Sequence, residues 1–239
     1  MTEATTTKLS LPRRAMVRAM VESAAVPCFY LRVTADVTEL LALRQALRND
    51  AAWAGRVPTV NDFVVRAAAL ALREHPHVNA AYLDGELATY ERVNVGVAIA
   101  VPGGLVAPCI YDADAKDMAA IAADVRELAE LASARRLGRE VLADGTFTVS
   151  NLGMFGIEDF DPILNPPQAA ILGVGAAMGE AERRTMRLTL GCDHRVLTGA
   201  EAAPFLLAVR DRLQHPEERP PPSTRVQGTQ PPGGETPWA

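Results

Sequence analysis

The chain has 239 residues, of which 49% are hydrophobic and 22% are charged, and its net charge at pH 7 is −5. These values fit one large globular domain or two small ones with a buried core. The negative charge argues against a nucleic-acid-binding surface, and the longest apolar runs fall short of the ~20 residues that a membrane helix needs. Because no apolar signal core with a cleavage site stands at the start, we expect no export.

The three cysteines, Cys28, Cys109 and Cys192, are odd in number and lie far apart in the chain. Their spacing matches neither a zinc site nor a disulfide framework, so the sequence predicts no metal centre. Unpaired thiols are typical of proteins in a reducing compartment, and we therefore expect a cytoplasmic protein.

Apolar periodicity and turn residues predict an alternation of helices and short strands along the chain. In chain order, the predicted elements are an arm over residues 1–9, a helix over 11–24, a strand over 28–33, helices over about 36–47 and 59–73, strands over 81–83, 87–90, 93–101 and 105–111, helices over 118–134 and 137–142, strands over 146–150, 169–174 and 185–190, and a helix over 200–213. The pattern indicates one α/β domain over residues 10–215 with a predominantly β core.

Local signals support several of these boundaries. Thr59 with Asp62 has the spacing of a capping box, and Asp36 with Glu39 resembles one. The helix after Thr59 is nearly all apolar, which predicts that it is buried. Asp84-Gly85-Glu86 predicts a hairpin turn, and residues 102–104 predict a second one.

The C-terminal segment, residues 216–239, has no apolar periodicity and holds seven of the 17 prolines. This composition predicts a disordered tail, and we expect it to bind no partner.

His194 is a candidate catalytic residue because it stands between an apolar strand and an amphipathic helix. A histidine at such a junction can be held rigidly and still reach a cleft, and imidazole exchanges protons near neutral pH. Taken alone, a single histidine is more often structural. His75 and His77 flank a helix-stopping proline and are interpreted as solvent-facing loop residues.

Three sequence blocks make a family resemblance specific. Residues 145–156 read G-T-F-T-V-S-N-L-G-M-F-G and are continued by residues 163–173. Residues 193–199 read D-H-R-V-L-T-G, a variant of the motif D-H-R-x-x-D-G. Residues 104–108 are followed by Asp112 and Asp114. Over residues 10–214 the chain resembles the catalytic domain of the dihydrolipoyl acyltransferases of 2-oxo acid dehydrogenase complexes.

The resemblance implies a chloramphenicol-acetyltransferase-like fold, with a mixed β-sheet core and flanking helices, in a homo-oligomer that is usually a trimer with active sites between subunits. It also implies acyl transfer between a coenzyme A thioester, such as acetyl-CoA, and an acceptor, with no permanently bound cofactor. His194 matches the general base and Ser150 the hydroxyl that stabilises the oxyanion. From the residues alone, Ser150 could simply end a strand and Asn151 could cap the following turn. The candidate supports of the site are Thr198, Arg13, Asn151, Asp193 and Gly199.

Two departures from the family pattern bear on function. Where the motif has an acidic residue or an asparagine, this chain has Thr198, which cannot form an ion pair with an N-terminal arginine, here Arg13. We also expect no lipoyl domain ahead of the core. Such a stand-alone form resembles the acetyltransferases of tetronate polyketide biosynthesis, which implies O-acetylation of a primary hydroxyl from acetyl-CoA and a partner enzyme that eliminates acetate.

Two alternatives stay open. The chain could be a dihydrolipoamide acyltransferase that works with a lipoyl domain in trans. It could also be a non-catalytic trimeric scaffold, an interpretation that Thr198 favours and that His194 with Ser150 opposes.

Overall fold

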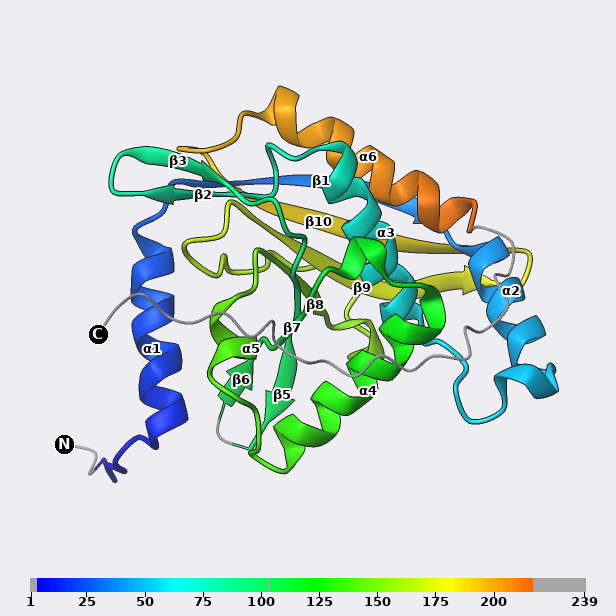
Figure 1. The fold of residues 1–239 in the computed structure, drawn as a ribbon, viewed down its shortest axis with the longest axis horizontal. Helices are drawn as coiled ribbons and strands as arrows, with labels where there is room; N and C mark the ends of the chain where they lie inside the picture. Colours follow the sequence, from blue (N-terminus) through cyan, green and yellow to red (C-terminus); the bar gives the residue numbers. More distant parts are fainter. Residues whose placement is uncertain (1–3, 103, 217–239) are drawn as a thin grey trace.

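The computed structural model describes residues 4–102 and 104–216 and has a mixed α/β architecture (Figure 1). The α-helices are α1 (Leu11–Ala24), α2 (Thr38–Arg48), α3 (Val60–Glu74), α4 (Met118–Ser133), α5 (Glu140–Ala143) and α6 (Gly199–Gln214), with 3-10 turns η1 (Ala51–Trp53), η2 (Ala113–Ala115) and η3 (Gly153–Phe155). The strands are β1 (Cys28–Asp36), β2 (Ala80–Leu83), β3 (Glu86–Thr89), β4 (Val95–Val97), β5 (Ile99–Val101), β6 (Gly104–Val106), β7 (Cys109–Ile110), β8 (Phe147–Asn151), β9 (Ala170–Glu180) and β10 (Arg183–Asp193).

The central sheet has six strands in the order β1-β10-β9-β8-β4-β7. Strands β1, β10 and β9 are antiparallel neighbours, whereas β8 runs parallel to both β9 and β4. The hairpins β2–β3 and β5–β6 form separate two-stranded ladders. This mixed sheet with flanking helices confirms the predicted fold class.

One face of the sheet forms the core against α3 and α6. Successive strand residues point to opposite faces, so Val149, Leu172 and Leu190 lie on the core side. All three are at most 1% exposed and belong to one cluster with residues of α3 and α6, including Phe205, whose ring lies 5.4 Å from that of Phe147. The opposite face of the same strands carries Thr148, Ser150 and Thr189 together with the apolar Ile171.

Helix α3 is buried, as its apolar sequence predicts. Nine of its 15 residues are buried. The predicted capping box is confirmed, because the Thr59 N–H donates to the Asp62 carboxylate at 2.7 Å and the Asp62 N–H donates to the Thr59 hydroxyl at 3.3 Å. These bonds satisfy N–H groups that the first helical turn leaves without partners.

Strands β9 and β10 are 11 residues each, longer than the apolar runs that predicted them. The residues added to β9 run from the buried Gly175 and Ala176 to the exposed hairpin end at 178–180, and those added to β10 include the buried residues 191–193. Hydrophobicity alone therefore missed both the exposed end of the hairpin and buried residues that are small or polar.

Other predicted boundaries were wrong. Asp36 and Glu39 do not form a capping box, because Asp36 ends β1 and its carboxylate accepts bonds from the N–H and hydroxyl of Thr38. By contrast, the second predicted hairpin is confirmed, because Val101 pairs with Gly104 between β5 and β6 and Val95 pairs with Ile110 in the same antiparallel register between β4 and β7. The short helix predicted over 137–142 begins three residues later and ends one residue later, in α5. His77 is exposed, but His75 is half-buried.

The predicted arm is described from residue 4, and residues 4–10 form no helix or strand. Apart from Pro216, the predicted tail over 216–239 lies outside the described residues. In the part of the chain that the structure describes, no helix combines the length and apolar character needed to cross a membrane.

Candidate active site

His194 lies directly after the last residue of β10 and is exposed. Its backbone N–H donates to the carbonyl of Pro27, and that of Asp193 donates to the carbonyl of Ala169, both at 2.8 Å. The imidazole ring lies 4.7 Å from the ring of Phe29. Among residues 4–102 and 104–216, no hydrogen bond to the imidazole is formed, so both ring nitrogens are available to a reactant.

Asp193 and Arg195, on either side of His194, form a bidentate ion pair. The guanidinium donates Nε–H to Oδ1 at 2.9 Å and Nη2–H to Oδ2 at 2.7 Å. Asp193 is 2% exposed, and its carboxylate also accepts the Arg195 backbone N–H at 2.9 Å. These hydrogen bonds raise the pKa of the Arg195 guanidinium above its ordinary value. The Asp193 carboxylate is therefore occupied by Arg195, and among the described residues it makes no hydrogen bond to the imidazole.

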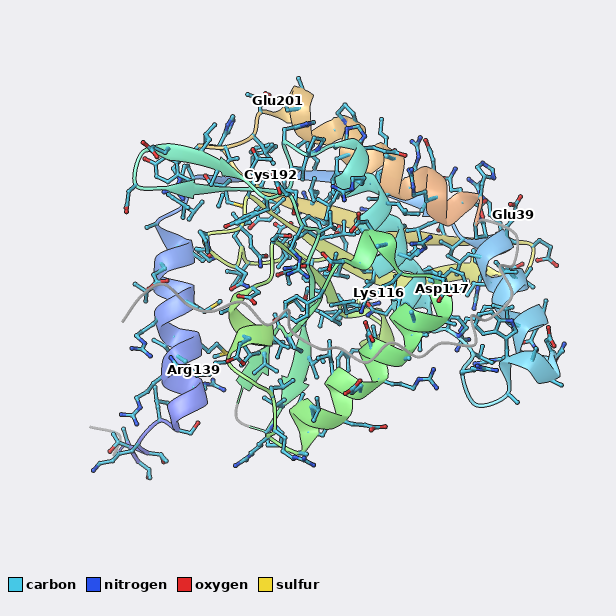
Figure 2. All side chains as sticks on the ribbon, in the orientation of Figure 1. Glu39, Lys116, Asp117, Arg139, Cys192 and Glu201 are labelled. Atoms are coloured by element: carbon cyan, nitrogen blue, oxygen red, sulfur yellow. The ribbon has the colours of Figure 1, made fainter. Side chains whose placement is uncertain are left out.

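Thr198 precedes the first residue of α6 and pairs with Glu201, which Figure 2 labels at the start of that helix. The Thr198 N–H and hydroxyl both donate to Glu201 Oε2, at 2.9 and 2.8 Å. These bonds, the backbone one first, lower the pKa of the Glu201 carboxyl. The hydroxyl is therefore engaged in capping α6. Sequence analysis missed this pair, although T-x-x-E is the spacing of a capping box.

Arg13 lies in the first turn of α1, and Figure 1 shows this turn far from the start of α6. Its side chain is exposed and makes no ion pair with any described residue. Within a single chain, Arg13 and Thr198 are therefore not in contact. Gly199 opens α6, and a Cβ there would meet no atom within 4 Å, so nothing in the described geometry requires glycine at this position.

Ser150 and Asn151 are the last two residues of β8 and directly precede a tight turn. The Asn151 Oδ1 accepts the Gly153 N–H at 2.8 Å, and its Nδ2–H donates to the side-chain Oδ1 of Asn61 at 3.2 Å. The predicted capping role of Asn151 is confirmed. Asn61, at the start of α3, belongs to no motif in the sequence, so it was not predicted to be a partner of Asn151.

Ser150 is half-buried and lines a pocket on the face of the sheet opposite the α3–α6 core. The pocket has an empty volume of about 1030 Å³, open solvent included, and its walls come from α1, the β6 region and residues 160–165. The Ser150 hydroxyl has no hydrogen-bond partner among the described residues. It is therefore free to donate to a molecule in this pocket.

One chain does not bring Ser150 and His194 together. Ser150 pairs with Gly173, which pairs with Thr189, two strands across the sheet. His194 lies five residues beyond Thr189. With a rise of about 3.3 Å per residue and a spacing of about 4.8 Å between strands, the two Cα atoms are on the order of 20 Å apart. A base and an oxyanion donor that serve one reacting carbonyl must each lie about 3 Å from it.

Gly153→Ala should disrupt the turn that presents Ser150. A Cβ at Gly153 would lie 2.6 Å from the Gly175 carbonyl oxygen and 3.0 Å from Ala176 Cα, both backbone atoms that cannot move aside cheaply. We expect the free energy of unfolding in urea to fall by about 1–3 kcal/mol. Gly104→Ala is the control, because a Cβ there meets no atom within 4 Å. Equal stability of the two variants would contradict the steric argument.

The whole described chain matches a family of known proteins. The family model described as 2-oxoacid dehydrogenases acyltransferase (catalytic domain) matches residues 1–219. The chain is 41% identical over 208 residues to dihydrolipoyllysine-residue acetyltransferase component 3 of the mitochondrial pyruvate dehydrogenase complex of Arabidopsis thaliana, covering 80% of this chain and 38% of that protein. It spans about half the length of the curated relatives it matches, or less.

Two solved structures have the same fold as this chain. Azotobacter vinelandii dihydrolipoamide acetyltransferase superposes with a TM-score of 0.83 at 33% identity, covering 89% of this chain and 92% of that chain. The study of that enzyme concerns a serine, a histidine and an asparagine four residues after the histidine in catalysis. A chloramphenicol acetyltransferase has the same fold, with a TM-score of 0.54 at 16% identity over 85% of this chain and 96% of that one. The chain therefore belongs to the family of 2-oxoacid dehydrogenase acyltransferase catalytic domains.

Proposed function

We propose that this chain is the catalytic domain of a dihydrolipoamide acetyltransferase, which moves an acetyl group between coenzyme A and a dihydrolipoyl group carried by a lipoyl domain. The observation that carries the proposal is the 41% identity over 80% of the chain to a dihydrolipoyllysine-residue acetyltransferase. This was the alternative in the sequence analysis. O-acetylation of a tetronate, with its eliminating partner enzyme, receives no support from these relatives.

The order of the candidate residues supports the same chemistry. In the Azotobacter enzyme the residues studied are a serine, a histidine and an asparagine four residues later. This chain has Ser150, then His194, and Thr198 four residues after it. Thr198 is the departure, and its hydroxyl caps α6 instead.

The proposed reaction uses His194 and Ser150 as follows. The His194 imidazole takes the proton of the acceptor thiol as its sulfur attacks the thioester carbonyl of acetyl-CoA. Negative charge develops on the carbonyl oxygen, and the Ser150 hydroxyl donates a hydrogen bond to it. When the intermediate collapses, the bond to the coenzyme A sulfur breaks and the imidazolium returns the proton to that sulfur. Acetyl-CoA is a co-substrate, and no permanently bound cofactor is needed.

The separation of Ser150 and His194 supports a site shared between two copies of the chain. Because the register keeps them on the order of 20 Å apart within one sheet, His194 of one copy would act with Ser150 of another. A closed ring of three copies repeats that contact identically, so we propose a homotrimer. Cytoplasmic location stays a prediction, since the Arabidopsis relative is mitochondrial.

An acyl-transfer assay read by mass spectrometry tests the function. Acetyl-CoA is offered with dihydrolipoamide and, separately, with a hydroxymethyl tetronate, and His194→Ala serves as the blank. Acetylation of dihydrolipoamide that the variant abolishes is the expected result. Acetylation of the tetronate alone would replace the proposal by O-acetylation, and transfer to neither acceptor would favour the scaffold.

A further inference from the structure

His194 lies between two side chains that are locked to each other. The Asp193 carboxylate and the Arg195 guanidinium share two hydrogen bonds, at 2.9 and 2.7 Å, and the Arg195 backbone N–H adds a third at 2.9 Å. His194 is thus the middle residue of a three-residue segment whose outer two residues are hydrogen-bonded to each other. The pair therefore adds a side-chain constraint to the backbone bond that the His194 N–H makes to the Pro27 carbonyl.

The ion pair is buried on one side only. The Asp193 side chain is 3% exposed, whereas the Arg195 side chain is 36% exposed. Water competes for the donors of an exposed guanidinium, and a long side chain has other rotamers to populate. The pair therefore needs a further contact to keep Arg195 in one position.

Tyr82 supplies that contact from the β2–β3 hairpin. The Arg195 guanidinium carbon lies 4.3 Å from the centroid of the Tyr82 ring, within the range of a cation–π contact. A ring in this position excludes water from one face of the planar guanidinium and restricts its rotation. The two residues are 113 positions apart, so the contact depends entirely on the tertiary structure.

The hairpin that carries Tyr82 is itself attached beside Asp193. The Ala169 N–H donates to the Ala80 carbonyl at 2.8 Å, and the Asp193 N–H donates to the Ala169 carbonyl at the same distance. Ala81 forms a further bridge with Gln168. A continuous chain of backbone hydrogen bonds therefore connects the base of the hairpin to the residue before His194.

We infer that Tyr82 is a positioning residue for His194: its ring holds Arg195 against Asp193, and the locked pair sets the position of the imidazole. This inference rests on the proposed function, in which His194 is the base. Tyr82 does not contact the reacting atoms in this arrangement. Its loss should lower kcat and leave KM for acetyl-CoA nearly unchanged, because orientation of the base matters in the transition state and not in substrate binding.

The experiment compares three variants of the hairpin in the dihydrolipoamide assay. Tyr82→Leu removes the aromatic face and should lower kcat by about tenfold. Tyr82→Phe keeps that face and should stay within about twofold of the parent. Leu83→Ala is the matched control, because this neighbouring side chain is exposed and points away from Arg195 along the alternating strand.

A double-variant cycle and a melting measurement separate positioning from stability. If the Tyr82 ring acts through Arg195, then Arg195→Gln should lower kcat. Adding Tyr82→Leu to that variant should change kcat by no more than about twofold further. A Tyr82→Leu protein that melts earlier but keeps the parental kcat would overturn the inference and leave Tyr82 a stabilising residue. An inactive parent protein would instead overturn the proposed function, so the two failures are distinguishable.

Discussion

His194→Ala should lower kcat for acetyl transfer to dihydrolipoamide by about 10²–10⁴-fold, because general-base catalysis contributes a factor of this size. Without the imidazole, the acceptor thiol must lose its proton to solvent before it attacks the thioester. KM for acetyl-CoA should change little if the imidazole acts mainly in the transition state.

The effect should be on chemistry and not on folding. The His194 side chain is exposed and lies near the Phe29 ring, whereas the backbone N–H that bonds to Pro27 is retained in the variant. His215→Ala is the control, since that side chain is 75% exposed at the end of α6. A His194→Ala protein with parental kcat would remove His194 from the mechanism and return the scaffold interpretation to consideration.

Ser150→Ala should lower kcat by about 10²–10³-fold, the usual cost of losing one oxyanion donor. The hydroxyl has no partner among the described residues, so its removal leaves no buried polar group unpaired within the chain. Ser133→Ala is a matched control, because that hydroxyl bonds to the Ala129 carbonyl of its own helix, α4. Activity equal to the parent would exclude Ser150 as the donor.

Mixing the two inactive variants tests whether one site uses two copies. If each site takes its base from one copy and its hydroxyl from the next, random reassembly of equal amounts restores about one quarter of the sites. If both residues of a site came from the same copy, every site would lack one of them and the mixture would stay inactive. Size measurement by light scattering before and after mixing verifies that the oligomers have exchanged subunits.

Several features could be predicted because they depend on neighbours in the chain. The capping box of α3 joins Thr59 to Asp62, and the first hairpin turns at Asp84 and Gly85, which both adopt positive φ. Such contacts span two or three residues, so residue type and spacing are sufficient to indicate them. The pairing of Thr198 with Glu201 at the start of α6 is of the same kind, and its T-x-x-E spacing could have been predicted from the sequence.

The sequence by itself therefore determined the α/β class, most of the elements and the identity of His194, Ser150 and Asn151 as candidates. Only the tertiary structure decided how they are arranged: that β9 separates β8 from β10, that Ser150 and His194 lie far apart in one chain, and that Tyr82 covers Arg195. The physical reason is that strand order and register follow from the burial of whole faces of the sheet, which no local pattern specifies. A contact between residues 113 positions apart becomes visible only when that packing is known.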